Sequence, residues 1–516
     1  MGLYERMLAA RGGEEPLPEK PPRASAAVVP WRRRGADRDG LEVYWVRRSP
    51  KLAFMGGWHA FPGGALAKGD AALPVAGKVS GLPANDDLPG LVAGALRELF
   101  EETGLLLSGG LEAEPEALER ARRRLLAEPQ SFPGLLAELE LGLDASRLSY
   151  AGRWLTPPLA PLRFDNRFFL LEWPERRDPQ PSIDRGELDE GEWIAPREAL
   201  RRCAAGETLA APPILHLLRV LAEDGPEGGQ ARLRDPWEAW LGSFLRIEFR
   251  PGTLLFPLRT YTLPPAGTTN CYLVGCGDAV LVDPGSPHAE ENERLLAALD
   301  EARSRLGRQP VEIWLTHHHP DHVGGVEALR RALDLPVRAH PHTAARLAER
   351  GIAVDGELTE GSEISLAGDP PLALRVLHTP GHARGHLAFH DAEHGTLVAG
   401  DLVAGMGTVV IDPPEGDMDD YLASLARLRD LPLRTLFPAH GPAIGDPPHK
   451  LQEYLDHRAW REGRVLEAWR AGLRTPAEIL PVVYDDAAPA ALPLAERQVV
   501  AHLERLERMG RLGALG

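Results

Sequence analysis

A short run of histidines with one aspartate constrains the fold of this 516-residue chain more than any other feature. Residues 316–322 read Thr-His-His-His-Pro-Asp-His, between a predicted β-strand at 311–316 and a predicted helix at 323–333. Such a loop can offer ligands to two adjacent metal ions, and imidazole with carboxylate suits Zn²⁺, Fe or Mn. His382, Asp401 and His440 follow at the ends of later predicted strands, each near Gly or Pro. We therefore expect these side chains to turn toward one shared centre.

The second half of the chain alternates short β-rich runs with amphipathic helices. The β-rich runs cover residues 269–275, 279–285, 372–382, 395–403 and 435–441. That alternation is typical of a layered α/β domain. From about Pro448 onward only helical patterns remain, over 450–472, 475–484 and 493–512. The sequence thus predicts an α/β domain followed by a small helical one.

The H-x-H-x-D-H string, followed in order by His, Asp and His, resembles the metallo-β-lactamase fold over residues 245–447. That resemblance implies an αββα architecture with two Zn, Fe or Mn ions. The implied ligands are His317, His319 and His382 for one ion and Asp321, His322 and His440 for the other, with Asp401 bridging. Asp321 is also expected to act in catalysis, and Asp283 to lie just behind the ligands. His318, His378 and His386 are interpreted as structural or exposed.

The chemistry that this resemblance implies is hydrolysis. Two metals about 3.5–4 Å apart would lower the pKa of a bridging water to near 7, and the hydroxide would attack an ester, thioester, amide or phosphodiester. Residues 268–275, 377–389 and 407–425 look like the lactamase-like endoribonuclease branch, whose members end in a small winged-helix-like domain. Closely similar sequences are acyl-carrier-protein thioesterases. Thioester and single-stranded RNA are both left open as substrates.

The last predicted helix carries basic residues that a nucleic-acid reader would want. They are Arg497, His502, Arg505, Arg508 and Arg511, and they are interleaved with Glu496, Glu504 and Glu507. Because the carboxylates cancel the positive charge, we interpret the helix as a solvated face packed on a core rather than as a recognition helix.

A cluster of carboxylates marks the first half of the chain. Residues 97–105 read Arg-Glu-Leu-Phe-Glu-Glu-Thr-Gly-Leu, so Glu98, Glu101 and Glu102 share one face of a predicted helix. Three like charges repel one another unless a cation neutralises them, and Mg²⁺ or Mn²⁺ with oxygen ligands is the natural partner. Taken alone, the pattern is more typical of a solvated acidic helix. The glycine-containing turn at 61–70 changes that balance in favour of a metal site.

Together with this turn, the cluster resembles the Nudix box, and the resemblance covers residues 25–222. The matching positions are Gly64, Arg97, Glu98, Glu101, Glu102, Gly104 and Leu105. Residues 47–64 and 163–170 look most like the coenzyme A diphosphatase branch. The resemblance implies an α/β/α sandwich in which Glu98, Glu101 and Glu102 bind Mg or Mn and serve in water attack on a pyrophosphate.

Two features depart from the Nudix pattern. Asp70 stands where the box usually has Glu, which puts that one ligand in doubt. Residues 71–96 separate Asp70 from Arg97, which makes 26 positions where the box has seven, an insertion of 19. A Nudix fold kept as a ligand sensor is therefore the alternative to an active pyrophosphohydrolase.

Charge and cysteine content narrow the functional classes. The chain has 58 basic and 75 acidic residues, and residues 251–516 hold 25 and 37 of them, a net of −12. A surface of this charge repels polyanions, which argues against a general nucleic-acid coat protein. Three cysteines suit a reducing compartment. No apolar run reaches the ~18 residues of a membrane span, so a cytoplasmic protein without a membrane partner is expected.

The predicted organisation has five parts. They are a flexible leader at 1–24, a Nudix domain at 25–222, a linker at 223–237, a metallo-β-lactamase-fold domain at 238–447 and a helical winged-helix-like domain at 448–516. The expected function is a bifunctional hydrolase acting on a nucleotide or coenzyme A-type small molecule at one site and on a thioester or ester at the other. The alternatives are a single-strand endoribonuclease with an attached Nudix sensor and a binding protein with two degenerate sites. The oligomeric state is left open.

Overall fold

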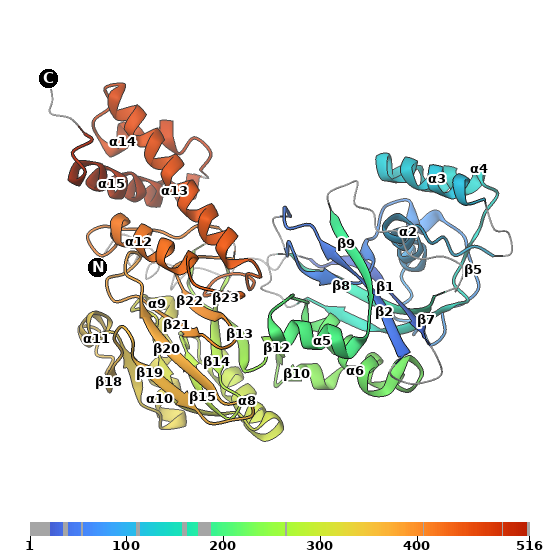
Figure 1. The fold of residues 1–516 in the computed structure, drawn as a ribbon, viewed down its shortest axis with the longest axis horizontal. Coiled ribbons are helices and arrows are strands. Elements are labelled where there is room, and N and C mark those ends of the chain that lie inside the picture. The colour runs from blue at the N-terminus through green and yellow to red at the C-terminus, as the bar shows by residue number, and fades with distance from the viewer. Residues whose placement is uncertain are drawn as a thin grey trace. The chain divides into compact units, whose positions relative to one another are not determined.

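The structure is a computed structural model that describes residues 21–34, 40–52, 55–109, 114–156, 162–173, 187–263, 266–405, 407–487 and 489–512. The chain divides into two compact units, one ending at Trp240 and the other beginning at Leu241 (Figure 1). The predicted leader lies outside the described residues up to position 20, and from Arg23 the chain is already a strand. None of the described helices has the length and apolarity needed to cross a bilayer.

The first unit is built on one mixed sheet of seven strands, in the order β3-β2-β1-β8-β7 with β4 beside β1 and β9 beside β2. The strands are β1 (Arg23–Arg33), β2 (Leu41–Arg48), β3 (His59–Ala60), β4 (Gly63–Ala65), β7 (Leu148–Leu155), β8 (Phe164–Glu172) and β9 (Leu188–Ile194). The middle strand β1 runs parallel to β8 and is buried from Ser25 to Trp31. Its nearly continuous apolar sequence is what burial on both faces requires.

Helices cover both sides of this sheet in Figure 1. They are α2 (Leu91–Thr103), α3 (Pro115–Ala127), α4 (Phe132–Glu138), α5 (Pro196–Ala205), α6 (Pro212–Gly228) and α7 (Gln230–Arg234). Leu96 and Leu99 of α2 share a core with Val28 of β1 and Phe169 of β8. Burial of this apolar stripe turns the acidic stripe of α2 away from the core.

The predicted linker at 223–237 is folded into the first unit. Helix α6 runs through it to Gly228, with a kink at Gly225, whose φ of 73° a residue with a side chain rarely adopts. The short helix α7 follows, and its Leu233 is buried. Gly and Pro here provide a sharp turn between two packed helices, whereas their abundance suggested an open loop.

The second unit begins as two sheets that pack face to face. One has the order β12-β13-β14-β15-β16-β17-β18 and the other β19-β20-β21-β22-β23. Trp314 of β16 meets Phe389 of β21 between them, with ring centroids 5.0 Å apart. The strands are β12 (Ile247–Arg250), β13 (Thr253–Arg259), β14 (Thr268–Val274), β15 (Asp278–Val282), β16 (Gln309–Trp314), β17 (Val337–Ala339), β18 (Gly356–Glu357), β19 (Glu363–Leu366), β20 (Leu372–His378), β21 (Leu387–Asp391), β22 (Thr396–Gly400) and β23 (Thr435–Pro438).

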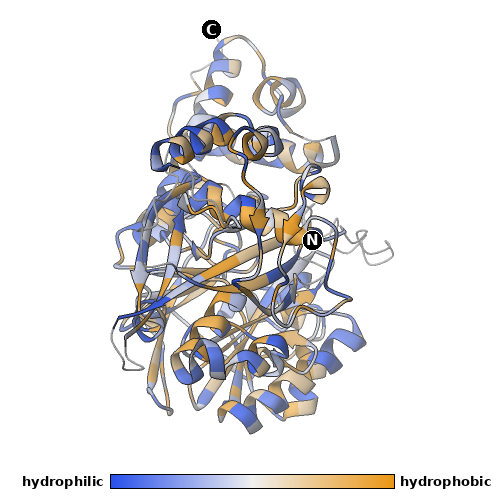
Figure 2. Cartoon of the chain, turned by 90° about the vertical axis from the view of Figure 1, so that its right-hand side faces the viewer, coloured by the Kyte–Doolittle hydropathy of each residue, from blue (hydrophilic) through white to orange (hydrophobic). Residues whose placement is uncertain are grey.

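Helices lie on the outer faces of both sheets, which completes an αββα arrangement. Leu295 and Leu299 of α8 (Ala289–Leu306) share a core with Leu329 of α10 (Val326–Leu333) and the first sheet. Leu425 and Leu428 of α12 (Met418–Arg429) pack in the core of the second sheet. Figure 2 colours the whole chain by hydropathy and shows strands that are largely apolar and helices that carry both apolar and polar residues.

Three helices complete the second unit. They are α13 (Pro447–Arg470), α14 (Pro476–Val483) and α15 (Leu492–Arg508), and the described residues beyond 447 include no strand. Leu451 and Tyr454 in the first half of α13 belong to the core of the second sheet. Val465 in its second half packs with Ile479 and Val499 in a separate small core. One long helix therefore ties the C-terminal helices to the α/β layers.

Candidate metal centres

The histidines and aspartates of the 316–322 string meet the later ones at one edge of the second unit. His317 and His319 follow β16, and Asp321 and His322 lie on the single turn α9 (Pro320–Val323). The remaining three follow β20, β22 and β23, and all seven side chains are buried: His317, His319, Asp321, His322, His382, Asp401 and His440. The metal-competent groups that they form are His317–His319–His382, His317–His322–Asp401 and Asp321–His322–His440. The role of each residue as a ligand stays a prediction.

Three imidazoles form the first half of the centre. The Nε2 atoms of His317 and His382 each lie 2.9 Å from Nδ1 of His319. Burial, reinforced by the neighbouring imidazoles, lowers the pKa of His317 and His319 well below the usual value. Neutral imidazoles whose ring nitrogens converge on one point are the donor set that a transition-metal ion takes.

Asp401 lies between the two halves of the centre. Its Oδ2 is 3.5 Å from Nε2 of His382, and its Oδ1 is 3.2 Å from Nε2 of His440 and 3.6 Å from Nε2 of His322. One carboxylate oxygen thus faces each half. Burial opposes ionisation of Asp401, but His440 and His322 outweigh it and hold the pKa of Asp401 well below its usual value.

The buried polar atoms at this edge fit a pair of metal ions. Among the described residues, both carboxylate oxygens of Asp321 and the Nε2 atoms of His322 and His440 are buried without a hydrogen-bond partner. Such atoms are costly to bury unless they bind something, and a cation satisfies all of them together. The donor set therefore suits a dinuclear metal site.

The opposite ring nitrogens are held by the protein, which orients each imidazole. Nδ1 of His382 donates to the Val410 carbonyl at 2.6 Å, and Nδ1 of His440 donates to the Thr268 carbonyl at 3.0 Å. Nδ1 of His322 donates to Asp283 at 2.8 Å. These bonds leave Nε2 of each ring to face the centre.

Asp283 supports the centre from behind, as the resemblance implies. Its carboxylate accepts from both the backbone N–H and the hydroxyl of Thr316, at 2.8 and 2.6 Å, besides the bond from His322. Its φ of 49° places it in the left-handed region, which is unusual for a residue with a side chain. His386, which the sequence suggested is not a ligand, accepts from the backbone N–H of Asp401 at 3.1 Å and so positions that residue. Thr316 and the Val410 carbonyl had no sequence signal.

The acidic helix α2 of the first unit faces the glycine turn. A Cβ at Gly64 would come within 2.6 Å of the Glu98 carboxylate, so only glycine lets that group lie against the turn. The backbone N–H of Gly63 donates to Glu102 at 2.9 Å. Helix α2 ends at Gly104, which caps it in the left-handed conformation.

Arg97 neutralises much of the charge on α2. Its guanidinium pairs with Asp70 at 2.9 Å, Glu98 at 2.8 Å and Glu101 at 3.2 Å. Asp70 also accepts from the backbone N–H of Ala67 at 2.8 Å and is buried. The carboxylate that stands where the box usually has Glu thus has both of its oxygens engaged by Arg97.

Burial and mutual repulsion disfavour the charged forms of Glu98 and Glu102 in spite of Arg97. Burial and the nearby Glu101 raise the pKa of Glu98 to about 7, against the opposing effect of Arg97. Burial and Glu98 raise the pKa of Glu102 well above its usual value. A divalent cation with oxygen ligands would relieve this repulsion. Among the described residues, however, the side chains that converge closely enough to hold a metal ion are all at the His/Asp centre, and the carboxylates of α2 are not among them.

The insertion in the box is folded and forms part of a separate two-stranded sheet in the first unit. Its β5 (Val75–Ala76) pairs with β6 (Leu143–Asp144). Asp86, also in the insertion, is buried and contacts Tyr150 on β7 and Arg167 on β8. The extra residues are therefore packed structure, which leaves the glycine turn and α2 in contact.

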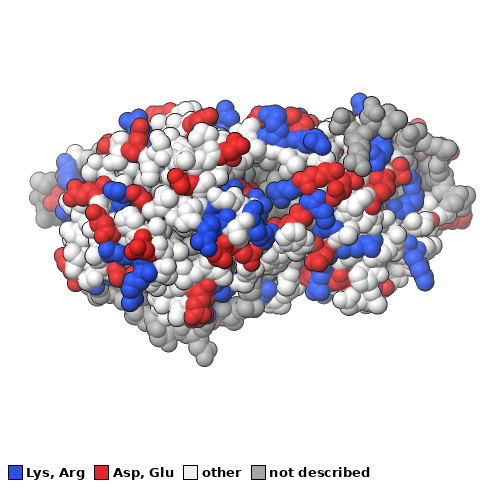
Figure 3. Space-filling model, turned by 90° about the horizontal axis from the view of Figure 1, so that it is seen from below, with Lys and Arg blue, Asp and Glu red and all other residues white. Residues whose placement is uncertain are grey.

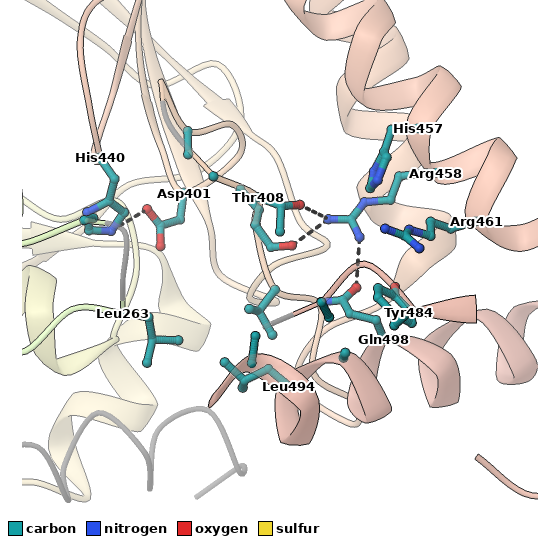
Figure 4. Close-up of a pocket in the computed structure, with 18 of the residues that line it drawn as sticks. Leu263, Asp401, Thr408, His440, His457, Arg458, Arg461, Tyr484, Leu494 and Gln498 are labelled. Atoms are coloured by element: carbon teal, nitrogen blue, oxygen red, sulfur yellow. Dashed lines mark hydrogen bonds and ion pairs between the residues drawn. The ribbon is translucent and has the colours of Figure 1, made fainter. Parts of the chain in front are cut away.

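A cavity of about 340 Å³ opens from the His/Asp centre toward the C-terminal helices. Asp401 and His440 line one end, and Arg458, Tyr484 and Gln498 line the other (Figure 4). Between them the wall is largely apolar and includes Leu263, Val409, Val410, Leu494 and Ala495.

Basic residues of α15 are engaged within the protein. Arg497 pairs with Asp412 at 2.5 Å, Arg505 with Asp419 at 2.7 Å, and Arg508 with Asp417 at 2.6 Å. On a different face, the one shown in Figure 3, positive and negative side chains are also interspersed. Little positive charge on α15 is left for phosphates.

Three family models match the chain. The metallo-beta-lactamase superfamily model matches residues 264–440, the NUDT19 Nudix domain model residues 75–221, and the beta-lactamase associated winged helix domain model residues 475–513. These matches confirm the expected order of the three domains.

Curated proteins and a solved structure are similar to parts of this chain. The Beta-lactamase-like protein 2 homolog of Drosophila melanogaster is 32% identical over 258 residues, 47% of this chain and 84% of that protein. The Atrochrysone carboxyl ACP thioesterase of Aspergillus chevalieri is 33% identical over 207 residues, 39% of this chain and 60% of that protein. A crystal structure of a NUDIX hydrolase from Alicyclobacillus acidocaldarius is 31% identical, covering 42% of this chain and 96% of that one, with a TM-score of 0.37. The chain therefore belongs to the metallo-beta-lactamase superfamily, as a hydrolase with a Nudix domain before its lactamase domain and a winged-helix domain after it.

Proposed function

We propose that this protein is a bifunctional hydrolase whose His/Asp centre cleaves an acyl thioester and whose Nudix site cleaves the pyrophosphate of a coenzyme A-type molecule. The observation that carries the first activity is the cavity, because its largely apolar wall begins at Asp401 and His440 and offers a slot for an acyl chain. The likeness to a protein named as an acyl-carrier-protein thioesterase supports the same choice.

Each group of the His/Asp centre has a proposed task. His317, His319 and His382 hold one Zn, Fe or Mn ion, Asp321, His322 and His440 hold the second, and Asp401 bridges them. The metals supply Lewis-acid activation of water and of the substrate carbonyl. Asp321 also serves catalysis because its carboxylate is free of hydrogen bonds from the described residues and can accept a proton at the centre. Asp283 and His386 keep His322 and Asp401 in place.

The Nudix activity rests on the carboxylates of α2. Glu98, Glu101 and Glu102 hold Mg²⁺ or Mn²⁺, which offsets the charge of a pyrophosphate. Arg97 keeps Glu98 and Glu101 oriented, and the turn at Gly63 and Gly64 keeps the approach to Glu98 and Glu102 narrow.

Single-strand RNA cleavage is the competing activity for the His/Asp centre. The pairing of Arg497, Arg505 and Arg508 with aspartates leaves few cations for a phosphate backbone. Thioester hydrolysis needs only the metals and the apolar slot, so its rate should depend little on salt. RNA binding on a single strand should weaken with a log–log slope of about −0.7 for each phosphate contacted.

A substrate panel on the metal-loaded full chain tests both activities. The panel holds a short-chain acyl thioester read by thiol release, coenzyme A read by separation of the two halves, and single-stranded RNA at two salt concentrations. Asp401→Asn should abolish thiol release and leave coenzyme A cleavage intact, and Glu102→Gln should do the reverse. Glu119→Gln on the exposed face of α3 is the matched control. RNA cleavage that collapses by about 200 mM salt, with no thiol release, would replace the thioesterase by an endoribonuclease. Intact coenzyme A would favour the Nudix sensor.

A further inference from the structure

Arg458 on α13 is a buried cation without a carboxylate partner. It is 2% exposed, and its guanidinium donates to Gln498 Oε1 at 3.0 Å, the Val409 carbonyl at 2.5 Å and the Thr408 hydroxyl at 3.4 Å. All three acceptors are neutral, the guanidinium carbon lies 5.3 Å from the centroid of the Tyr421 ring, and no ion pair joins Arg458 to a carboxylate of the described residues. Burying an unpaired charge is expensive, so its retention here calls for an explanation.

Neighbouring arginines in the same region are paired. Arg461, one turn further along α13, forms two bonds to Asp486, at 2.9 and 2.7 Å. Arg505 pairs with Glu462 and Asp419, and Arg497 with Asp412. At this end the cavity is lined by one carboxylate, that of Asp486, and by two guanidiniums, those of Arg458 and Arg461. The end of the cavity beside α13 thus carries net positive charge.

Other hydrogen-bonding atoms at this end also lack partners. The Nε atoms of Arg458 and Arg461, Nε2 of Gln498 and the hydroxyl of Tyr484 are buried without a hydrogen bond among the described residues. Gln498 accepts through Oε1 from Arg458, which leaves its Nε2 as a donor. Three of the four groups can only donate, and these uncompensated N–H dipoles add to the positive potential of the two guanidiniums at this end of the cavity. A complementary ligand there is negatively charged.

The cavity joins these donors to the dinuclear centre. Figure 4 shows Asp401 and His440 at one end and Arg458, Gln498 and Tyr484 at the other. A single molecule can therefore place its reacting carbonyl at the metals and a second polar group at Arg458. The apolar wall between the ends would accommodate the connecting atoms.

We propose that Arg458 and Gln498 bind an anionic group, a carboxylate or a phosphate, on the same molecule whose ester or thioester bond is cleaved at the dinuclear centre. This inference rests on the proposed function and narrows its substrate to molecules with a compact oxyanion some distance from the scissile bond. A carboxylate would belong to the acyl part, and a phosphate to the thiol part. Arg458 is on this view a specificity residue that touches substrate and takes no part in bond breaking.

Two matched pairs of thioesters test this inference in the metal-loaded full chain. Succinyl and butyryl thioesters of N-acetylcysteamine differ by a carboxylate on the acyl group. Butyryl thioesters of 4′-phosphopantetheine and of pantetheine differ by a phosphate on the thiol. Arg458→Gln should lower kcat/KM for the anionic member of one pair by about 10- to 100-fold, the range of a charge-assisted hydrogen bond, and for the neutral members by less than about threefold. Which pair responds identifies the anion.

Controls separate binding from folding. Arg470→Gln, at an exposed position of the same helix, should change neither member of either pair. Arg458→Lys keeps the charge without the fork of donors and should retain part of the anion preference. Equal losses for anionic and neutral members in both the Gln and the Lys variants would mean a purely structural role and overturn the inference. If only the Lys variant folds, the same comparison is made with it.

Binding measurements keep this test independent of the thioesterase proposal. Calorimetric titration with inorganic phosphate and with succinate should show one of them binding wild type and Arg470→Gln at least ten times more tightly than Arg458→Gln at equal metal content. Equal binding by all three proteins would overturn the anion site. Anion binding with no thioester hydrolysis would overturn the thioesterase proposal and leave the anion site standing.

Discussion

The two acidic centres of this molecule balance their charge in opposite ways. On α2 an arginine of the same helix, Arg97, pairs with Asp70, Glu98 and Glu101. At the His/Asp centre, Asp321 and Asp401 have only imidazoles within ion-pair distance among the described residues. The first centre is partly neutralised by the protein, whereas the second has no arginine or lysine partner among the described residues and suits metal ions. Removal of bound metal should therefore destabilise the second centre more than the first.

Loss of one imidazole should break the second centre, and this is the largest effect we expect. His317→Ala removes an imidazole that belongs to two of the three metal-competent groups. The amount of bound metal should fall. Thioester turnover should drop about 1,000-fold, because the activation free energy should rise by several kcal/mol. Metal analysis and thiol release measure this, with exposed His449→Ala as control. Unchanged metal content and turnover would remove His317 from the centre.

Charge removal on α2 should have a smaller effect, confined to the Nudix activity. Glu98→Gln keeps the size of the side chain but removes a charge that offsets the cation, so coenzyme A cleavage should fall by about 100-fold. Because the pKa of Glu98 is raised by burial and like charge, thermal unfolding should stay the same or move up. A clear fall in the unfolding temperature would show that Glu98 is needed for packing.

Removal of Arg97 tests, by a stability measurement, whether this residue neutralises the first centre. Arg97→Gln leaves Asp70 buried without its guanidinium, which should cost about 3–5 kcal/mol of unfolding free energy in the first unit. Denaturant titration measures it, and Arg123→Gln, an exposed arginine of α3, should cost well under 1 kcal/mol. Equal costs for the two variants would refute internal neutralisation.

The support behind the second centre should give the smallest effect. Asp283→Asn weakens the acceptor for His322 and Thr316, so metal affinity should fall by about 10- to 100-fold while the fold persists. Competition with a chelator measures the affinity, and exposed Asp300→Asn is the control. An affinity equal to wild type would leave Asp283 with a structural role alone.

Much of this fold was predictable because its signals are local. The helix that carries Glu98, Glu101 and Glu102 appears as α2, and the β-rich runs of the second half appear in the two sheets. The prediction of a linker at 223–237 was wrong, because the tight turn at Gly225 and the burial of Leu233 depend on packing against distant strands.

The order and spacing of residues by themselves determined which chemical groups the protein can bring to each centre. Short-range patterns specify strand ends, and strand ends in one layered domain meet at a common edge, so the seven His and Asp side chains could be named in advance. Only the tertiary structure decided which ring nitrogen each histidine presents, that Asp70 serves Arg97, and that Arg458 meets Gln498 forty positions later. Those pairings depend on packing between distant segments, where burial makes an unpaired charge or donor costly and so selects its partner.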